Sequence, residues 1–416
     1  MQIKTILNRI QKFKSFVYGA VRLVEGTPVP TLEVEIQPRS NSRPVCSGCG
    51  HKGPGYDRSP ERLFEFIPMW GHKVFFRYAP RRVDCPDCGV RVERMPWVSG
   101  KHRLTEAYCW FLAGWAKRLS WKEVSEAFHT TWDHVFCSVE RAVTWGREHQ
   151  DLSGVKAIGV DEIAWQRGHR YLTLVYQIDS RCKRLLWVGE KRTVRTLLRF
   201  FRWFGKDRSQ ALKFVCSDMW KPYLKVIAKK AAQAVHVLDR FHIVQWVNEA
   251  LNQLRRRLFS GAPQDDLGRT FKIKKWMLLS AREKLPHKDK LVLAKLMALN
   301  RPLFQAYLLK EQLRAILQYP WKYLGVLRSR IREWIDAAIA TNLAELARVA
   351  RRLQPHIEAV VAGHKHHIKL GLVESINSKI AALRVQARGY SDPEYFKLKI
   401  FQRCALPDNP WAHIVL

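Results

Sequence analysis

The spacing of apolar and polar residues predicts a mixed sheet in the middle of the chain. Short apolar runs follow one another as three strands, and two further strands then alternate with segments whose apolar residues recur at helical spacing. Three consecutive strands followed by alternating units indicate an α/β fold with helices on the faces of a mixed sheet. The predicted strands are 155–160, 171–178, 184–189, 212–216 and 234–238, and the predicted helices are 193–204 and 220–232.

Helical spacing dominates on both sides of this sheet. Residues 104–148 predict three helices, and Ser120 is a suitable N-cap for the second, with Glu123 as its capping-box partner. This is a helix-turn-helix layout, which serves either to read DNA or to pack against another subunit. Beyond the sheet the same spacing predicts helices at 248–259, 271–284, 288–299, 303–319, 334–353 and 370–388.

Four of the nine cysteines form two C-x2-C pairs, Cys46 with Cys49 and Cys85 with Cys88. Each pair places two thiolates on one turn, where both reach a tetrahedral zinc ion at ~2.3 Å. Apolar stretches between the pairs predict short strands, so residues of about 40–100 are expected to form a zinc ribbon with four cysteine ligands. The alternatives are coincidence and disulfides; the odd cysteine count and the lack of a secretion signal argue against disulfides.

The composition indicates that the protein binds a polyanionic partner. The 416 residues include 72 Lys and Arg against 37 Asp and Glu, which gives a net charge of +35. By segment, the net charge is +9 for 1–104, −1 for 105–150, +13 for 151–258 and +14 for 259–416. One basic run alone is usually a solvated face, but an excess over three regions favours a long path for a nucleic-acid backbone.

The composition also excludes other classes of protein. With 47% hydrophobic residues, the chain is not a disordered basic tail. No apolar stretch approaches the ~18 residues of a membrane span. Lysines and arginines interrupt every apolar run near the N-terminus, which argues against a signal peptide.

Three carboxylates are candidates for catalysis. Asp161 and Asp218 stand where predicted apolar strands run out, and ligands of open sheets bind beyond the strand ends. Either aspartate alone would more often be a cap or turn residue, but two of them in this strand order favour a site. Glu374, in the last long helix, could join them. Three carboxylates can hold two Mg²⁺ ions, which activate an attacking oxygen and stabilise a leaving one.

The sequence resembles bacterial insertion-sequence transposases of the ISL3 family over nearly the whole chain. This resemblance implies a zinc ribbon, a helix-turn-helix and an RNase H-like DDE catalytic domain with a large all-helical insertion before the Glu374 helix. It also implies that Asp161, Asp218 and Glu374 are the metal-binding triad. The segments that carry it are the two cysteine pairs, 120–132, 159–162, 217–223, 238–244 and 374–379.

The expected activity is that of a DNA transposase that binds insertion-sequence ends, cleaves phosphodiesters and joins the 3′-hydroxyl ends to target DNA. The alternatives are a metal-dependent nuclease without strand transfer and an inert DNA-binding regulator. We expect a homodimer or larger assembly on double-stranded DNA, in the bacterial cytoplasm with the nucleoid. The expected domains are 1–103, 104–150, 151–258 (core), 259–355 (helical insertion) and 356–416 (end of the core).

Other residues are candidates for supporting roles. Asp239 and His242 follow the fifth strand, and would lie beside the triad or cap a helix. His364, His366 and His367 predict a flexible basic turn rather than a zinc site. Basic clusters could hold DNA, with a solvated helix surface as the alternative. The DNA-binding candidates are Arg255, Arg256, Arg257, Lys272, Lys274, Lys275, Lys379 and Arg388.

Overall fold

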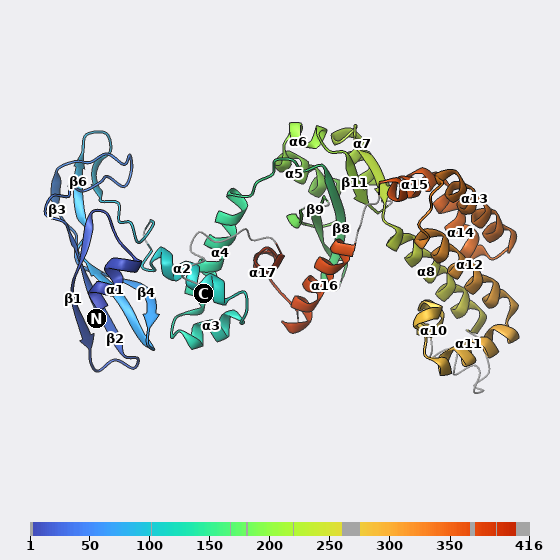
Figure 1. Ribbon diagram of the computed structural model, residues 1–416, viewed down its shortest axis with the longest axis horizontal. Helices are drawn as coiled ribbons and strands as arrows, with labels where there is room; N and C mark the ends of the chain where they lie inside the picture. The colour runs from blue at the N-terminus through green and yellow to red at the C-terminus, as the bar shows by residue number, and fades with distance from the viewer. Residues whose placement is uncertain are drawn as a thin grey trace. The chain divides into compact units, whose positions relative to one another are not determined.

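The chain forms two compact units (Figure 1). The computed structural model describes residues 3–100, 102–166, 168–179, 182–218, 220–259, 275–366, 371–387 and 389–404. The described residues of Met1–Asp151 and Glu394–Leu416 make the first unit, and those of Leu152–Pro393 make the second. The second unit is therefore inserted, along the sequence, into the first.

The first unit begins with a helix and a four-stranded sheet. The strand order is β1-β2-β5-β4, in which β2 and β5 run parallel and the other neighbours antiparallel. Trp97 lies in its core, with ring centroids 4.9 Å from Phe16 and 5.3 Å from Tyr78. The elements are α1 (Ile3–Ile10), β1 (Phe16–Val24), β2 (Thr31–Pro38), β4 (Arg62–Met69) and β5 (His72–Tyr78).

A second, three-stranded sheet carries the cysteine pairs. Its order is β3-β6-β7, with β3 at Gly55–Arg58, β6 at Arg81–Cys85 and β7 at Gly89–Val92. The strands predicted between the cysteine pairs are present as β4 and β5, but they belong to the larger sheet. The cysteines therefore lie on strands and turns that the apolar pattern did not reveal.

Three helices follow, as predicted: α2 (Glu106–Trp115), α3 (Trp121–Ala127) and α4 (Trp132–Glu148). The predicted capping box is confirmed, because the Glu123 amide donates to Ser120 Oγ at 3.2 Å and the Ser120 amide donates to Glu123 Oε2 at 2.7 Å. The last helix, α17 (Pro393–Cys404), packs against this group, where Trp121 Nε1 donates to Gln402 at 3.3 Å.

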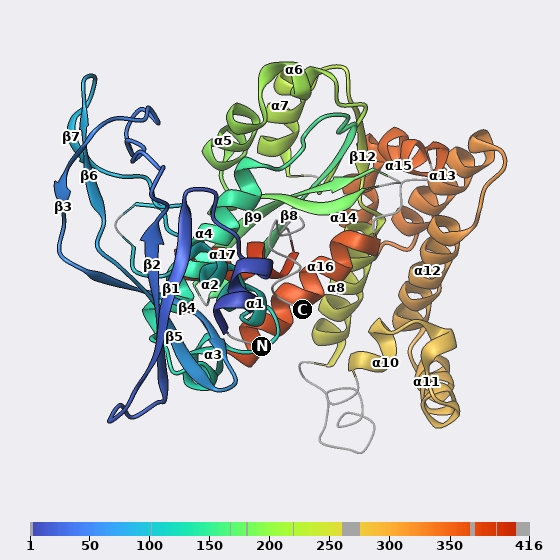
Figure 2. The ribbon, with the colours of Figure 1, turned by 60° about the vertical axis from the view of Figure 1, so that its left-hand side comes forward.

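The second unit is built on the mixed five-stranded sheet that the sequence predicts, in the order β10-β9-β8-β11-β12. The first three strands are antiparallel to their neighbours, whereas β8, β11 and β12 run parallel. Figure 2 shows α5, α6 and α7 together over this sheet. The strands are β8 (Ala157–Gln166), β9 (Arg170–Ile178), β10 (Lys183–Glu190), β11 (Phe214–Ser217) and β12 (Val235–Leu238), and the helices are α5 (Val194–Phe204), α6 (Lys206–Gln210) and α7 (Lys221–Lys230).

One strand end differs from the prediction. The first strand of the sheet was expected to end at Asp161, but β8 continues to Gln166 because it stays paired with β9. Its parallel pairing with β11 stops earlier, at Gly159 opposite Cys216. Asp161 therefore lies within a strand, yet just beyond the last pair on the β11 side.

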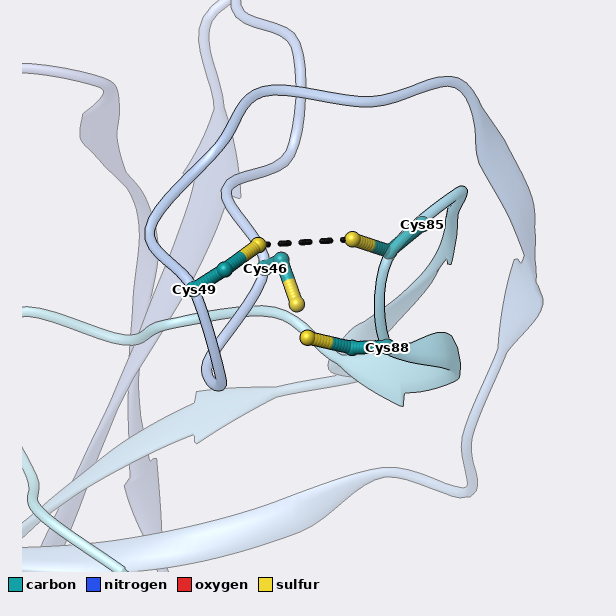
Figure 3. Close-up of side chains that lie close together, drawn as sticks. All are labelled: Cys46, Cys49, Cys85 and Cys88. Carbon is teal, nitrogen blue, oxygen red and sulfur yellow. Dashed lines mark hydrogen bonds between the residues drawn. The ribbon is translucent and has the colours of Figure 1, made fainter.

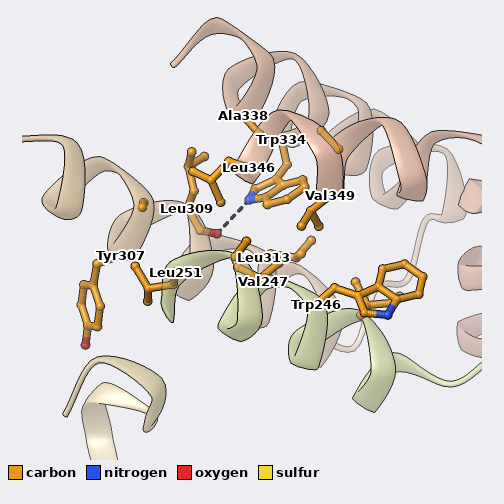
Figure 4. Close-up of a cluster of buried hydrophobic side chains, with 14 of the residues drawn as sticks. Trp246, Val247, Leu251, Tyr307, Leu309, Leu313, Trp334, Ala338, Leu346 and Val349 are labelled. Atoms are coloured by element: carbon orange, nitrogen blue, oxygen red, sulfur yellow. Dashed lines mark hydrogen bonds between the residues drawn. The ribbon is translucent and has the colours of Figure 1, made fainter. Parts of the chain in front are cut away.

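The helical segment between the sheet and Glu374 has its own core (Figure 4). Trp334 is buried there and its indole N–H donates to the carbonyl of Leu309 at 2.8 Å. The all-helical prediction holds for the described residues. The helices are α8 (Arg240–Phe259), α10 (Lys275–Leu279), α11 (His287–Leu299), α12 (Arg301–Gln318), α13 (Leu324–Ala340), α14 (Ala344–Leu353) and α15 (Ile357–Lys365).

Helix boundaries needed correction in three places. The helix predicted from 248 begins at Arg240, directly after β12. The single helix predicted at 334–353 is two helices, because Asn342 between α13 and α14 has a left-handed φ of 56°. The turn predicted at the histidines starts later than expected: His364 lies in α15, His366 caps it, and His367 is outside the described residues. No helix among the described residues has the length and apolarity to cross a membrane.

Candidate active site and metal centre

The four cysteines of the two pairs converge at one point (Figure 3). Their sulfur atoms lie within 4.8 Å of one another, and those of Cys49 and Cys85 are 3.4 Å apart. In a tetrahedral site with Zn–S distances of ~2.3 Å, neighbouring sulfurs lie ~3.8 Å apart. The cluster therefore has the dimensions and the thiolate chemistry of a structural zinc site.

The backbone around the cysteines supports the same use. The glycine that follows each cysteine pair has positive φ, 79° at Gly50 and 69° at Gly89. The amides of Cys49 and Gly48 donate to the Cys46 sulfur and lower the pKa of that thiol to about 7. A Cβ added at Gly48 would lie 3.0 Å from Cys88 Sγ. The loop thus approaches the sulfurs as closely as glycine allows.

Asp161 lies in β8, and Asp218 directly follows β11, the parallel neighbour of β8. The register pairs Gly159 with Cys216, and two further residues along each strand place Asp161 level with Asp218. Asp239 stands in the same relation one strand further, since Ser217 pairs with Leu238. The sheet edge where β8, β11 and β12 diverge therefore gathers carboxylates from three strands, as the sequence predicted for the first two.

Helix α16 (Gly371–Gln386) supplies the partner of Asp161. Asn377 Nδ2 donates to Asp161 Oδ2 at 2.6 Å, while the hydroxyl of Tyr176 donates to the Asn377 carbonyl oxygen. The Glu162 amide donates to Asp161 Oδ1 at 2.8 Å. Asp161 is therefore held by a side chain of the late helix and by its own strand. Asn377 was not among the predicted site residues, although it lies within 374–379, one of the segments that carry the family resemblance.

Glu374 is three residues before Asn377, so both project from one face of α16. Its side chain is exposed, and it makes no hydrogen bond or ion pair with another described residue. Among the described residues, three or more potential ligand atoms come within 4.8 Å of one another in two groups: the four-cysteine cluster, and Cys49 with His51 and Asp87. The structure thus places Glu374 on the helix that contacts Asp161, but does not bring the three predicted ligands together.

Two further residues at this edge, Arg192 and Glu162, were not predicted as site residues. Arg192, between β10 and α5, forms an ion pair with Asp218 and lies 3.3 Å from Glu162 Oε1. Its guanidinium also stacks over the ring of Trp220 at 4.8 Å. Glu162 is next to Asp161 in β8, so it points to the opposite face of the sheet. Arg192 therefore links a carboxylate from each of two strands.

Three carboxyl groups of this edge, those of Asp161, Glu162 and Asp239, have pKa values above those of free carboxyl groups. Burial raises the pKa of Glu162 to about 8, and the charge of Asp218 adds to the shift. Burial also raises the pKa values of Asp161 and Asp239. Buried carboxylates of like charge repel, so a cation bound here would stabilise them. Glu162 Oε1 has no hydrogen-bond partner among the described atoms.

The two supporting candidates occupy different positions. His242 Nε2 lies 3.8 Å from Asp161 Oδ1, beside the predicted catalytic residue. Asp239 Oδ1 accepts from the Phe241 amide at 2.8 Å, which is the bond of a residue that caps a helix, here α8. His242 therefore lies beside the predicted triad residue Asp161, and Asp239 caps a helix.

The basic candidates separate into groups. Arg255 is buried and bonds to Asn252, Arg257 pairs with Glu345 at 2.8 Å, and Arg256 is exposed. Lys379 is exposed on α16, and Lys275 lies over the Trp276 ring at 4.9 Å. Lys272, Lys274 and Arg388 lie outside the described residues. Only part of the predicted set therefore presents a charge to solvent.

Comparison with known proteins gives consistent matches. A family model described as a transposase, of the ISL3 type, matches residues 158–400. The transposase for insertion sequence element IS1001 of Bordetella parapertussis is 28% identical over 396 residues, which cover 94% of this chain and 96% of the relative. The transposase for insertion sequence element IS1557 of Mycobacterium tuberculosis is 29% identical over 383 residues, with 86% and 85% covered.

Proposed function

Because the family model matches more than half of the chain, the protein belongs to the ISL3 family of transposases, and we propose that it cleaves DNA at the ends of an insertion sequence and joins the freed 3′-hydroxyls to target DNA. The reacting centre is the sheet edge of the second unit, as an RNase H-like core. Asp161, Asp218 and Glu374 are its catalytic residues. The observation that carries this assignment is the level placement of Asp161 and Asp218, with Asp161 bonded to the Glu374 helix.

The donor set at this edge fits Mg²⁺. It offers carboxylate oxygens beside the guanidinium of Arg192; burial raises the pKa values of Asp161 and Glu162, and the charge of Asp218 adds to both shifts. Asp161 and Asp218 would hold the ions and Glu374 would complete their coordination. Two Mg²⁺ ions bound there would activate the attacking oxygen and stabilise the leaving one.

The chain's own residues prepare this centre. Asn377 fixes the direction of the Asp161 carboxylate by donating to Oδ2, and Tyr176 in turn fixes Asn377. His242 faces the other Asp161 oxygen, with Nε2 3.8 Å from Oδ1. Arg192 pairs with Asp218 and neutralises its charge in the metal-free protein.

The first unit has supporting roles in this proposal. A zinc ion on the four cysteines stabilises the three-stranded sheet, and α2, α3 and α4 act as a helix-turn-helix that contacts DNA or a second subunit. The protein works as a dimer or larger assembly, so that two transposon ends are held together.

Joining of a pre-cut 3′ end to a plasmid tests the proposal. The wild-type protein with Mg²⁺ should produce joined molecules, and Asp218→Asn should abolish both joining and end cleavage while the variant still binds end DNA. Asp207→Asn, which changes an aspartate on α6 away from the sheet edge, is the matched control. Persistent Mg²⁺-dependent cleavage by Asp218→Asn would refute the triad.

The two alternatives give different results in the same assay. A nuclease without strand transfer would cleave end DNA in a triad-dependent way but would join nothing. A regulator with an inert core would bind end DNA and neither cleave nor join it.

A further inference from the structure

Helices α5 and α7 present a row of cations that the proposed reaction does not use. Arg195, Arg199 and Arg202 are exposed along α5, and Lys221, Lys225 and Lys229 are exposed along α7. Their spacing of three or four residues puts each set on one helix face. The opposite faces of both helices are buried together over the sheet, through residues such as Phe200, Phe204, Val226 and Ile227.

These cations have no acidic neighbours to neutralise them. Residues 191–206 and 219–238 contain no Asp or Glu. None of the six side chains forms an ion pair with another described residue, and the one acidic residue of α6, Asp207, lies outside both ranges. On α13, by contrast, Arg328 pairs with Glu358 at 2.7 Å and Arg330 with Glu333 at 2.9 Å. The charge on α5 and α7 is thus available to a partner from outside the chain.

Both helices begin at the edge that holds the carboxylates. Helix α5 starts two residues after Arg192, which contacts Asp218, and α7 starts three residues after Asp218 itself. Strands β8, β10 and β11 all point to this edge, because β9 is antiparallel to its two neighbours and β11 is parallel to β8. The two cationic faces therefore lead away from the reacting centre over one face of the sheet.

We infer that the exposed face of α5 and α7, defined by these six cations, holds the backbone of the double-stranded target DNA during strand transfer; this inference rests on the proposed function. Successive cations on each helix are separated by ~5–6 Å along the axis, given a rise of ~1.5 Å per residue. One strand of duplex DNA carries a charge every ~3.4 Å, so each helix offers about one cation for every second phosphate.

The chemistry of this face favours target DNA over the transposon ends. Its exposed polar side chains are lysine and arginine, whose charge holds any phosphate backbone and carries no preference for sequence. End DNA must be selected by sequence, which calls for base-edge contacts; arginine and lysine can make such contacts with guanine, but α5 and α7 expose no Asn, Gln, Asp or Glu to read the other bases. A duplex that is accepted whatever its sequence needs only the phosphate contacts that this face provides.

The test uses two double variants of the full chain, chosen away from the sheet edge: Arg199→Ala with Arg202→Ala, and Lys225→Ala with Lys229→Ala. The control is Arg328→Ala with Arg330→Ala, which removes the same charge from a face where acids are close. Three quantities are measured: random-sequence duplex binding against salt, cleavage of end DNA, and joining of a pre-cut end to a plasmid. Circular dichroism verifies that each variant is folded.

Each double variant should lower the salt slope of duplex binding by about 2, because each phosphate contact contributes about 0.9. When the salt concentration rises from 50 to 200 mM, the affinity of a double variant for duplex DNA should therefore fall by a factor about 12-fold smaller than that of the wild type. Joining to the plasmid should fall about tenfold, while end cleavage and the control variant stay within about twofold of the wild type.

Two results would overturn the inference. An unchanged salt slope in both double variants would mean that the face is only solvated. A parallel loss of end cleavage and joining would mean that end DNA lies there instead. A wild-type protein that joins no ends would refute the proposed function, and duplex binding by the double variants would still decide whether the face holds DNA.

Discussion

Arg192 occupies the position at the sheet edge where positive charge is needed most. Its guanidinium meets Asp218 and Glu162 and rests on Trp220, in a region where burial already disfavours ionised carboxylates. Without it, two carboxylates of one edge would repel each other unopposed. Under the proposed function, Arg192 substitutes for part of the charge that Mg²⁺ would bring, and it pairs with both carboxyl groups in the metal-free protein.

This position predicts how Arg192→Ala responds to Mg²⁺. The metal-free variant should lose about 2 kcal/mol of stability, the typical cost of a buried charged group that loses its partner. Mg²⁺ should then raise the melting temperature of the variant more than that of the wild type, because the ions restore the missing charge. Thermal unfolding with and without Mg²⁺ measures both effects, with Arg195→Ala as the control. Equal Mg²⁺ shifts in all three proteins would contradict this role.

His236 makes the stability of the folded protein depend on pH in the acid range. It lies on β12 with Nε2 2.9 Å from Ser217 Oγ, and burial lowers its pKa to about 4. The folded state therefore holds the neutral ring, while the unfolded chain takes up a proton near pH 6.5. The stability that this residue contributes is complete above pH 6.5 and is lost as the pH falls towards 4.

The expected loss is about 1.4 kcal/mol per pH unit, or about 2 kcal/mol between pH 6.5 and 5. His236→Gln should remove this component, so the stability of the variant should fall less than that of the wild type over the same interval. Urea unfolding at pH 6.5 and 5 measures the difference directly. Parallel losses in both proteins would show that His236 titrates alike in the folded and unfolded states.

At the scale of elements, the cysteine cluster lies at the turn between β6 and β7, where Cys85 ends β6 and Cys88 precedes β7. This sheet is small, and small folds commonly depend on a metal for their stability. We predict that the purified protein contains one zinc ion per chain, and that Cys85→Ser loses the ion together with the order of β3, β6 and β7. Metal analysis and hydrogen exchange measure these two results.

Cys137→Ser is the control for that prediction, because Cys137 lies in α4 apart from the cluster. It should retain the zinc and the exchange protection of the sheet. Retention of zinc by Cys85→Ser would mean that the metal is held elsewhere, and a zinc-free wild-type protein with an ordered sheet would mean that the cluster needs no ion.

The strands and helices of the second unit were predictable where the apolar pattern determines them. The runs around Ile158, Leu174 and Val215 are buried in the sheet, and their short length and hydrophobicity mark them in the sequence. Element ends were less predictable. Strand β8 continues past Asp161 because β9 supplies partners, and α13 stops because Asn342 adopts a left-handed conformation, and neither cause is visible in local spacing.

Residues of the candidate site were predictable where the sequence directly around them carries a signal. Asp161 and Asp218 follow apolar runs, so the strand ends identified them. Arg192 and Asn377 depend on contacts across more than twenty and more than two hundred residues respectively, and no pattern around either residue marks them. The folded geometry determines which distant polar groups meet. The spacing of apolar residues predicts which residues form the core, but not these polar contacts.

On the scale of the whole molecule, the chain leaves the first unit after Asp151 and returns to it at Glu394. The returning helix α17 is part of that unit's core: Phe396 is fully buried, Tyr395 meets Trp121 at a centroid distance of 4.6 Å, and Arg147 lies over the ring of Phe401 at 4.8 Å. The first unit therefore completes its packing only after the entire second unit has been synthesised.

This chain path predicts a selective effect of Phe396→Ala. Loss of a fully buried aromatic ring costs about 3–5 kcal/mol, and the cost should fall on the unit that contains α17. Hydrogen exchange should become faster in α2, α3 and α4 and stay unchanged in the sheet of the second unit. Phe200→Ala, at an equally buried ring between α5 and the sheet, should give the opposite pattern. If either variant loosened both units alike, the two would unfold as one cooperative body rather than separately.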